Sequence, residues 1–307
     1  MAHRRCTISE LLKQLAPQQA LCAFNVENFD TLLPALKAAA EVDAPVVIAF
    51  SVPAARYLGF EFAAELAELT ARRFGTTYAL HLDHCEDPDD LRDAARTGFT
   101  SANFLSENTA DSDRYLRKAV ALRNEYESEA LSLEFILGTL GHQHDEIGPP
   151  APTVPEITAF AEACRPDILG FHCGSLHGMP HRSRDIDAAM IAAAAAATQL
   201  PLVLHGSSGV REQQVLMGID AGIRKINIET AIRAVFTDTL TAFIGSGGSA
   251  VRKPRYLTMA IDEALTSTFR EYLELYTLRT AHLSPLPLGI IPGGPLPSWS
   301  ESHSTHR

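Results

Sequence analysis

The sequence contains no apolar run that approaches the roughly 18 residues needed to span a membrane. The basic residues Arg4 and Arg5 are not followed by the apolar stretch of about 7–15 residues that a secretory signal carries. Both absences argue against export and against membrane binding. We therefore expect a cytoplasmic protein with no membrane partner.

Cysteine is scarce and irregularly placed. The five cysteines are an odd number, and they are scattered along the chain without a Cys-X-X-Cys pair. This pattern argues against a disulfide framework and against a cysteine-based zinc finger. It is typical of a protein kept in a reducing cytoplasm.

Positive charge is also in deficit. The 26 Lys and Arg residues face 37 Asp and Glu residues, for a formal net charge of −11 at pH 7. Such a surface repels polyanions, so we expect no nucleic-acid partner. A small phosphorylated molecule is still compatible with it, because backbone amides and helix N-termini can bind a phosphate locally.

The sequence does contain a regular alternation of strand-like and helix-like segments. Its 307 residues are 46% hydrophobic and 21% charged, which suits a soluble globular chain with a large core. Short apolar, β-branched runs alternate with amphipathic stretches. The expected strands are Leu21–Val26, Pro45–Ser51, Thr77–Asp83, Phe99–Leu105, Ala130–Leu137, Asp167–Cys173, Leu200–Gly206 and Ile223–Glu229.

This alternation predicts an α/β protein whose parallel strands are joined by helical crossovers. Eight such units favour a closed (β/α)8 TIM barrel, which has no free sheet edge. An open doubly wound sheet is the alternative. The absence of a Gly-X-Gly-X-X-Gly fingerprint after the first strand weakens that alternative.

Helical patterns fill the crossovers and continue past the last strand. Among the crossovers, Asn28–Val42 and Asp187–Thr198 are expected to be helices. After the eighth strand, the helical stretches Ala231–Ile244 and Tyr256–Leu278 flank a flexible loop at Gly245–Ser249. The barrel is therefore expected to carry extra C-terminal helices.

The domain organisation follows from these elements. Residues 1–283 are expected to form one barrel domain that includes the C-terminal helices. The last residues, 284–307, hold many Pro, Gly, Ser and His residues, and we expect them to form a loosely ordered tail.

Three segments place histidine at or just past the C-terminal end of a strand. They read YALHLDH over Tyr78–His84, GFHCGSLHG over Gly170–Gly178 and LVLHGSSG over Leu202–Gly209. In a (β/α)8 barrel these ends meet at one mouth, where active sites lie. Neutral imidazole binds zinc, and three protein ligands with one open position typify a catalytic site. The convergence therefore predicts a catalytic metal centre.

The first of these segments leaves the direction of its side chains open. Strand alternation points His81 and Asp83 to one side and Leu82 and His84 to the other. Because the strand ends near His84, bond rotation there can still bring neighbouring side chains to one site.

The ends of the seventh and eighth strands are rich in small and polar residues. They read HGSSG over His205–Gly209 and KINIET over Lys225–Thr230. Small residues let backbone amides approach an anion, and the loops after strands seven and eight are the frequent phosphate site of this architecture. We therefore expect a phosphate group to bind there.

These segments together resemble the class II, metal-dependent aldolases that act on fructose-bisphosphate or tagatose-bisphosphate. The similar blocks follow the family's order from about residue 8 to residue 280. They are Ala23–Asn28 (AFNVEN), His81–His84 (HLDH), Gly98–Ser101 (GFTS), Leu176–Gly178 (LHG), Leu202–Gly209 (LVLHGSSG) and Lys225–Thr230 (KINIET).

The resemblance implies a role for each matching residue. His84, His177 and His205 would bind Zn²⁺ or another divalent metal, and Asp83 would exchange the proton of the substrate hydroxyl beside the bond that breaks. The remaining matches would hold a dihydroxyacetone-phosphate unit, with a monovalent cation as a further family feature. They are Ser51, Gly178, Gly206, Ser207, Ser208, Asn227, Ile228, Glu229 and Thr230. The resemblance also implies a homo-oligomer.

Three positions depart from the family pattern. An acidic residue after strand four is replaced by Leu105, or by Phe104 if the alignment slips by one. The second of two glutamates after strand five is replaced by Ile136. The loop glutamate expected to move the carbon-bound proton has become His144, which we take as a catalytic residue. A histidine can serve as a base there, since its ordinary pKa is about 6.5. Asp145 or Glu146 could take the same role.

The sequence thus favours a metal-dependent aldolase, which is a lyase. It would join or split dihydroxyacetone phosphate, or a similar ketose unit, and an aldehyde through a metal-stabilised enediolate. Lys225 suggests a Schiff-base route, but the three histidines favour the metal. Two alternatives stay open, the first because of Leu105, Ile136 and His144, and the second because an isomerase or epimerase would use the same enediolate. One is a non-catalytic ketose-phosphate-binding barrel or partner subunit, and the other is a metal-dependent isomerase or epimerase.

Overall fold

The computed structural model describes residues 3–106, 112–127, 131–141, 149–178, 185–246 and 253–280. His144, Asp145, Glu146 and the expected tail at 284–307 lie outside the described residues, as does most of the expected loop at Gly245–Ser249. The predictions made for them stay predictions, as does the assignment of residues 1–283 to one domain.

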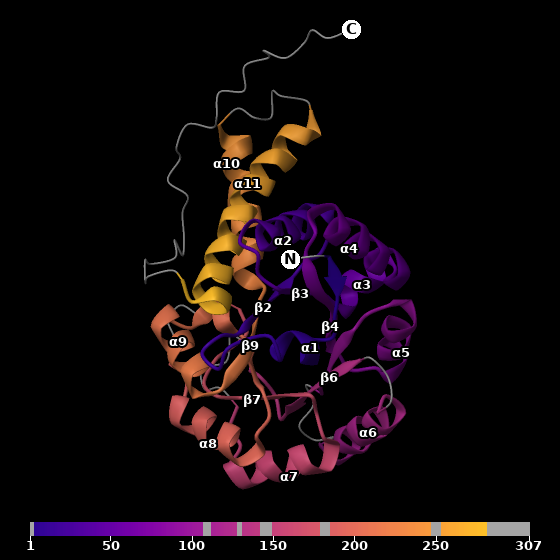
Figure 1. Cartoon of the computed structure of the whole chain (residues 1–307), viewed down its shortest axis with the longest axis vertical. Coiled ribbons are helices and arrows are strands. Elements are labelled where there is room, and N and C mark those ends of the chain that lie inside the picture. The colour runs from indigo at the N-terminus through magenta and orange to yellow at the C-terminus, as the bar shows by residue number, and fades with distance from the viewer. Residues whose placement is uncertain are drawn as a thin grey trace, which may run out of the picture.

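A closed parallel barrel forms the centre of the described molecule (Figure 1). Its hydrogen-bonded order runs β4-β3-β2-β9-β8-β7-β6-β5, and a further pairing of β4 with β5 closes the ring. The strands are β2 Leu21–Asn25, β3 Val46–Ser51, β4 Thr77–Cys85, β5 Ser101–Phe104, β6 Ser132–Leu137, β7 Ile168–Phe171, β8 Leu202–Leu204 and β9 Ile223–Ile228.

The predicted (β/α)8 barrel is therefore confirmed, and the open doubly wound sheet is excluded by the β4–β5 pairing. Each expected strand is present with ends that differ by at most a few residues. The prediction succeeds because parallel strands are covered on both faces and read as short apolar runs.

Helices surround the barrel and cover its outer face (Figure 1). Side chains just before several helices fix their starts, as Asn28 does by accepting from the Thr31 amide at the start of α2. The crossover helices are α2 Phe29–Glu41, α3 Val52–Leu58, α4 Phe60–Phe74, α5 Pro88–Thr97, α6 Ser112–Glu125, α7 Val154–Cys164, α8 Ala188–Thr198 and α9 Glu212–Ala221. None of the helices in the described ranges is long and apolar enough to cross a membrane.

The C-terminal helices extend beyond the barrel, as Figure 1 shows. Helix α10 (Thr230–Gly245) follows β9, and α11 (Pro254–Tyr272) continues into a π-helical segment at Leu273–Leu278. Helix α11 packs against α2, where Lys37 donates to Asp262 at 2.9 Å. These elements confirm the predicted extra C-terminal helix.

Two short N-terminal elements were not predicted. Strand β1 (Arg4–Arg5) pairs with the beginning of β4, and helix α1 (Ile8–Leu12) lies inside the ring of strands in Figure 1. Ile8 and Leu11 of α1 are fully buried. They close the end of the barrel opposite the C-terminal ends of the strands. Side chains that point into the barrel pack against them, namely Leu21, Ala23, Val47, Ala79, Ile168 and Val203.

Candidate active site

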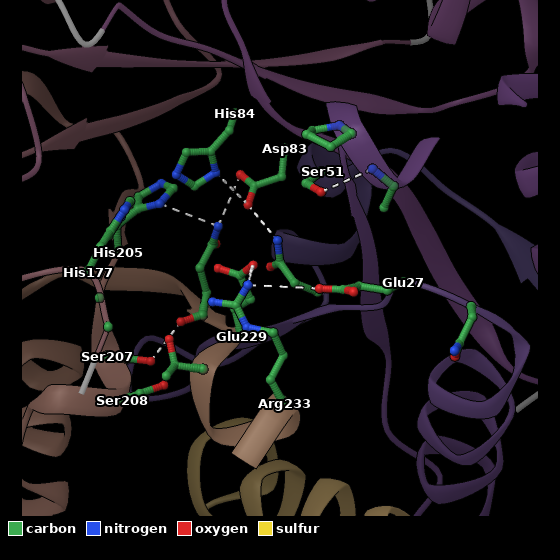
Figure 2. A pocket seen from close by; sticks show the side chains of 18 of the residues that line it. Glu27, Ser51, Asp83, His84, His177, His205, Ser207, Ser208, Glu229 and Arg233 are labelled. Carbon is green, nitrogen blue, oxygen red and sulfur yellow. Dashed lines mark hydrogen bonds and ion pairs between the residues drawn. The ribbon is translucent and has the colours of Figure 1, made fainter. Parts of the chain in front are cut away.

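A cavity of about 830 Å³ opens at the C-terminal ends of the strands. Its walls come from the ends of β2, β3, β4, β8 and β9, from the segments that follow them, and from the segment after β7. Figure 2 shows polar side chains converging on it from both sides. The cavity lies where a barrel of this type places its active site.

Three histidines meet on one side of this cavity. His84 comes from β4, His177 from the segment after β7, and His205 from the end of β8. One ligand atom of each lies within 4.8 Å of the other two. The three rings are 5.0–5.9 Å apart between centroids. Three imidazoles in this arrangement suit a divalent cation such as zinc and leave coordination positions for a substrate.

The backbone at the end of β4 turns His84 toward this group. The pairing of β4 with β5 shifts register between Leu82 and Cys85, and His84 has a φ of 57°. Few residues other than glycine adopt this left-handed conformation, and it interrupts the alternation of the strand. His84 and Asp83 therefore both line the cavity, although a regular strand would separate them.

Asp83 lies at the floor of the cavity with only 1% of its surface exposed. Its Oδ2 accepts from Nδ2 of Asn25 at 2.7 Å and lies 2.9 Å from Nδ1 of His84. Its Oδ1 accepts from Nδ2 of Asn227 at 3.3 Å. Burial alone would raise the pKa of Asp83, but His84 and the other nearby rings outweigh it and hold the pKa well below its usual range. Asp83 is therefore held in its carboxylate form.

His205 is oriented from below by Glu134 of β6. Nε2 of His205 lies 2.8 Å from Oε1 of Glu134, and the same oxygen accepts from Nδ2 of Asn103 at 2.6 Å. Burial raises the pKa of Glu134, but the ammonium of Lys225 and the His205 ring lower it below its usual range. A carboxylate that accepts from one ring nitrogen leaves the other nitrogen as the metal-binding atom.

A second wall of the cavity has the character of an anion site. The segment Ser207–Gly209 forms a 3₁₀ turn, and Oγ of Ser207 donates to the carbonyl of Asn227 at 2.7 Å. Helix α10 begins at Thr230; the preceding Glu229 makes no side-chain capping bond, and the amide of Ala231 donates to Oγ of Ser208 at 3.3 Å. The positive end of this 16-residue helix therefore faces the cavity beside Ser207 and Ser208.

Gly206 brings the two walls together. Its φ is 65°, and a Cβ atom there would lie 2.5 Å from the carbonyl oxygen of Leu176 and 3.1 Å from the amide nitrogen of His177. Backbone atoms cannot yield in the way that a flexible side chain can. The segment that carries His177 therefore packs directly on the end of β8, and glycine is required at this position.

The chain matches the family described as "Fructose-bisphosphate aldolase class-II" over residues 7–279. It belongs to this aldolase family. Among solved structures, it resembles the YdjI aldolase from Escherichia coli K12, with 21% identity, a TM-score of 0.77, and coverage of 89% of this chain and 97% of that one.

It also resembles fructose-bisphosphate aldolase from Campylobacter jejuni, with 18% identity, a TM-score of 0.74, and coverage of 88% and 93% of the two chains. At this level of identity the structural likeness shows the fold alone, and the class II family assignment comes from the sequence match.

The structure brings together most of the residues that the family resemblance pointed to. The cavity is lined by Ser51, Asp83, His84, His177, Gly178, His205, Gly206, Ser207, Ser208, Asn227, Glu229 and Thr230. Ile228 is the exception, because its side chain is 1% exposed and packs in the core between the barrel and its helices. Strand alternation explains this, since Asn227 points into the barrel and Ile228 away from it.

Two of the three departures from the class II pattern, Leu105 and Ile136, are not among the residues that line the described cavity. Ile136 is fully buried and Leu105 nearly so. Ile136 packs beside Gly170 of β7, where a Cβ atom on the glycine would lie 3.0 Å from it. Buried apolar side chains thus occupy the two positions at which the family resemblance led us to expect acidic residues.

Sequence reasoning missed several residues of the cavity. Asn25 at the end of β2 bonds to Asp83, and its position on the same strand face as Leu21 and Ala23 could have indicated this. Arg233, one turn into α10, pairs with Glu229 at 3.0 Å and lies 3.9 Å from Glu27 (Figure 2). The Arg233–Glu229 spacing of four residues is a helical ion-pair signal.

Proposed function

We propose that this member of the class II aldolase family is a metal-dependent lyase. It would make or break a carbon–carbon bond between dihydroxyacetone phosphate, or a similar ketose unit, and an aldehyde. One observation carries the proposal: three imidazoles with ligand atoms within 4.8 Å lie beside a buried carboxylate, in a cavity whose other wall is a helix N-terminus.

The donor set fits a resident metal ion. His84, His177 and His205 would hold zinc or another divalent metal, with Glu134 orienting His205 and Asp83 contacting His84. When bound, the ion would act as a Lewis acid that stabilises the negative charge that develops on the ketose fragment.

The protein groups would position the ketose and move its protons. Ser207, Ser208 and the first amides of α10 would bind the phosphate, with a monovalent cation as a further family feature. In the cleavage direction, Asp83 would take the proton of the hydroxyl beside the scissile bond. As the bond breaks, the hydroxyl carbon becomes the aldehyde and the electron pair passes to the ketose fragment. A protonated side chain, acting as general acid, then donates a proton to that carbon of the ketose fragment, and His144, Asp145 or Glu146 remains the proposed donor.

A Schiff-base mechanism is a poorer account of this site. Lys225 is fully buried and is not among the residues that line the cavity. Its Nζ contacts Glu134 at 2.8 Å and Asn227 at 2.7 Å. A lysine that attacks a carbonyl must present a free amine to the substrate, and these contacts direct the Lys225 amine elsewhere.

Two alternatives remain. Because of Leu105, Ile136 and His144, the barrel could bind a ketose phosphate without turnover. An isomerase or epimerase could instead use the same enediolate without breaking the carbon–carbon bond. Each alternative predicts that a ketose phosphate binds while no aldehyde product forms.

The test begins with protein that a chelator has stripped of metal. Carbon–carbon bond formation from dihydroxyacetone phosphate and a panel of aldehydes is then measured before and after zinc is restored. We expect activity only with metal. Full activity in the stripped protein would contradict the proposal. Binding without turnover would favour the non-catalytic barrel, and solvent hydrogen exchange without cleavage would favour an isomerase.

Several wider proposals rest on the family rather than on the geometry. We propose that the substrates are a phosphorylated ketose and an aldehyde, that the enzyme works in the cytoplasm and that it is a homo-oligomer. Sedimentation of the purified protein would test the last of these directly.

A further inference from the structure

Lys225 is a buried cation that the proposed chemistry leaves without a task. It lies on β9, points into the barrel and has 0% of its surface exposed. Its Nζ contacts Glu134 Oε2 at 2.8 Å, Asn227 Oδ1 at 2.7 Å and Nε2 of His81 at 3.4 Å. An ammonium group has three N–H donors, so the three neighbours match its capacity.

One of these contacts leads to a metal-binding candidate. Lys225 holds one oxygen of the Glu134 carboxylate, and the other oxygen contacts His205 Nε2 at 2.8 Å. Asn103 donates to that second oxygen at 2.6 Å, which fixes the plane of the carboxylate. Because Glu134 is held as a carboxylate acceptor, Nε2 of His205 carries the hydrogen. Nδ1, which lies 3.5 Å from Nδ2 of Asn227, is then the nitrogen with a lone pair to offer a metal.

A second contact leads to the proposed proton carrier. Asn227 Oδ1 accepts from Lys225, so the amide nitrogen of Asn227 points the other way, toward Oδ1 of Asp83 at 3.3 Å. Reversal of this amide would set its NH₂ group against the ammonium and its oxygen against the carboxylate. The ammonium therefore selects the orientation in which Asn227 donates to Asp83.

The third contact joins Lys225 to His81 of β4. His81 lies 3.4 Å from Nζ through Nε2, and its Nδ1 is 2.8 Å from Oγ of Ser101. The same Nε2 is 3.8 Å from Oδ1 of Asp83. Lys225 thus touches groups that lead to His205 on one side and to Asp83 on the other.

We propose that Lys225 is a positioning residue that orients His205 and Asp83 together, His205 through Glu134 and Asp83 through Asn227. The proposal rests on the proposed function, in which His205 holds the metal and Asp83 moves a proton. A buried ion pair often stabilises a fold no better than apolar side chains of similar volume would. The directional contacts of Lys225 therefore matter more for orientation than for folding.

The experiment uses zinc affinity, kcat, KM for dihydroxyacetone phosphate, and the Tm of metal-free protein. Zinc affinity is measured by competition with a chromophoric chelator. Lys225→Met removes the ammonium and keeps the length of the side chain. Lys37→Met is the matched control, because Lys37 also donates to a carboxylate, that of Asp262 at 2.9 Å, but lies between α2 and α11.

We expect Lys225→Met to weaken zinc binding about 10- to 100-fold, the range typical for loss of a group that orients a metal ligand. We also expect kcat of the zinc-loaded variant to fall by a similar factor, while KM changes less than about threefold because the phosphate wall is untouched. Lys37→Met should leave zinc affinity and kcat unchanged.

The double variant Lys225→Met/Glu134→Gln covers the case in which the single variant fails to fold. It leaves no unpaired carboxylate in the barrel, so its Tm should recover most of what Lys225→Met loses. Its kcat should stay low, because the Asn227 amide still lacks the Lys225 ammonium that fixes its orientation toward Asp83. If a folded single or double variant has the zinc affinity and kcat of the wild type, the proposal is overturned. Lys225 would then have a structural role only.

The readouts separate this inference from the proposed function. If the wild-type protein binds zinc but joins no aldehyde to dihydroxyacetone phosphate, the proposed function fails, while zinc affinity still decides whether Lys225 orients His205. If the wild-type protein binds no zinc, both are overturned.

Discussion

The two ends of the barrel interior are lined by opposite kinds of residue, although β2 and β4 contribute to both. At the end closed by α1, the interior side chains are apolar: Ile8, Leu11, Leu21, Ala23, Val47, Ala79, Ile168 and Val203. At the end below the cavity they are polar and almost equally buried: Asn25, His81, Asp83, Ser101, Asn103, Glu134, His205, Lys225 and Asn227.

The change occurs within two residues along a strand. On β4 the inward positions pass from Ala79 to His81 and Asp83, and on β8 and its end they pass from Val203 to His205. Apolar packing stabilises without fixing direction, whereas buried polar groups are costly unless each is paired in a defined geometry. The apolar end therefore holds the strands in place, and the polar end orients the reactive groups.

The largest effect on activity should come from removing a metal-binding candidate at the polar end. We expect His205→Ala to lose bound zinc and at least about a thousandfold in kcat/KM, because a metal's charge stabilisation contributes several kcal/mol to a barrier. Zinc content and initial rates are measured on the same preparation. His3→Ala is the control, since His3 pairs with Glu68 away from the cavity. An active, zinc-containing His205→Ala protein would refute the metal site.

A smaller loss is expected from the carboxylate beside the histidines. Asp83→Asn should lower kcat about a hundredfold to thousandfold, the usual share of a general base, while zinc content stays close to that of the wild type. Stopped-flow assays with the zinc-loaded variant would measure this. Asp89→Asn, on the exposed start of α5, should be nearly neutral. Unchanged kcat in Asp83→Asn would show that another group carries the proton.

The apolar end should respond in stability and not in chemistry. Ile168→Ala should lower the free energy of unfolding by about 3 kcal/mol, as expected for a cavity in a packed core. Its kcat and zinc affinity should match the wild type while the protein is folded. Denaturant titration and rate assays check both, with Ile244→Ala, at a side chain 52% exposed, as the control. A large fall in kcat would show that the two ends are not separable.

The smallest effect should come from a carboxylate outside the barrel interior. Burial raises the pKa of Glu68. The hydrogen bonds from His3 and Tyr78 lower it by more than burial raises it, so the pKa lies below its usual value. A carboxyl group whose pKa is lower in the folded than in the unfolded protein stabilises the fold at pH values above the unfolded pKa of about 4.3. This stabilisation is lost as the pH falls through the folded pKa.

Glu68→Gln should therefore cost less than about 1 kcal/mol at pH 7, given the partial exposure of the pair. The difference from wild type should shrink as the pH falls below about 4. Urea unfolding at several pH values would measure it, with Glu65→Gln, on the exposed face of the same helix, as the control. A difference that grows in acid would contradict the assigned direction.

Most of the fold was predictable from the sequence because buried parallel strands are short apolar runs between helical patterns. The elements that were missed show the limit of that signal. Helix α1 has five residues, too few for a periodic pattern, and β1 at Arg4–Arg5 pairs through its backbone alone. The one side-chain signal for α1 is its capping box, Thr7 with Glu10, which marks a helix start and could have indicated it.

The site was predictable only in part. Family-like blocks indicated the histidines, but strand alternation separated His84 from Asp83, and the register shift with its positive φ could not be read from the sequence. Lys225 suggested a nucleophile, whereas its partners lie on other strands of the closed barrel, namely Glu134 on β6 and His81 on β4. Such contacts depend on closure and register. His144 stays a prediction.

Gly206 has a practical consequence for engineering. Because any side chain there would collide with the backbone at Leu176 and His177, a single substitution would disturb two histidines at once. Mutagenesis of the cavity should therefore hold position 206 constant and vary lining residues whose side chains are exposed, such as Tyr57. Recombination with other barrels is best attempted with the stretch from 176 to 206 exchanged as one cassette.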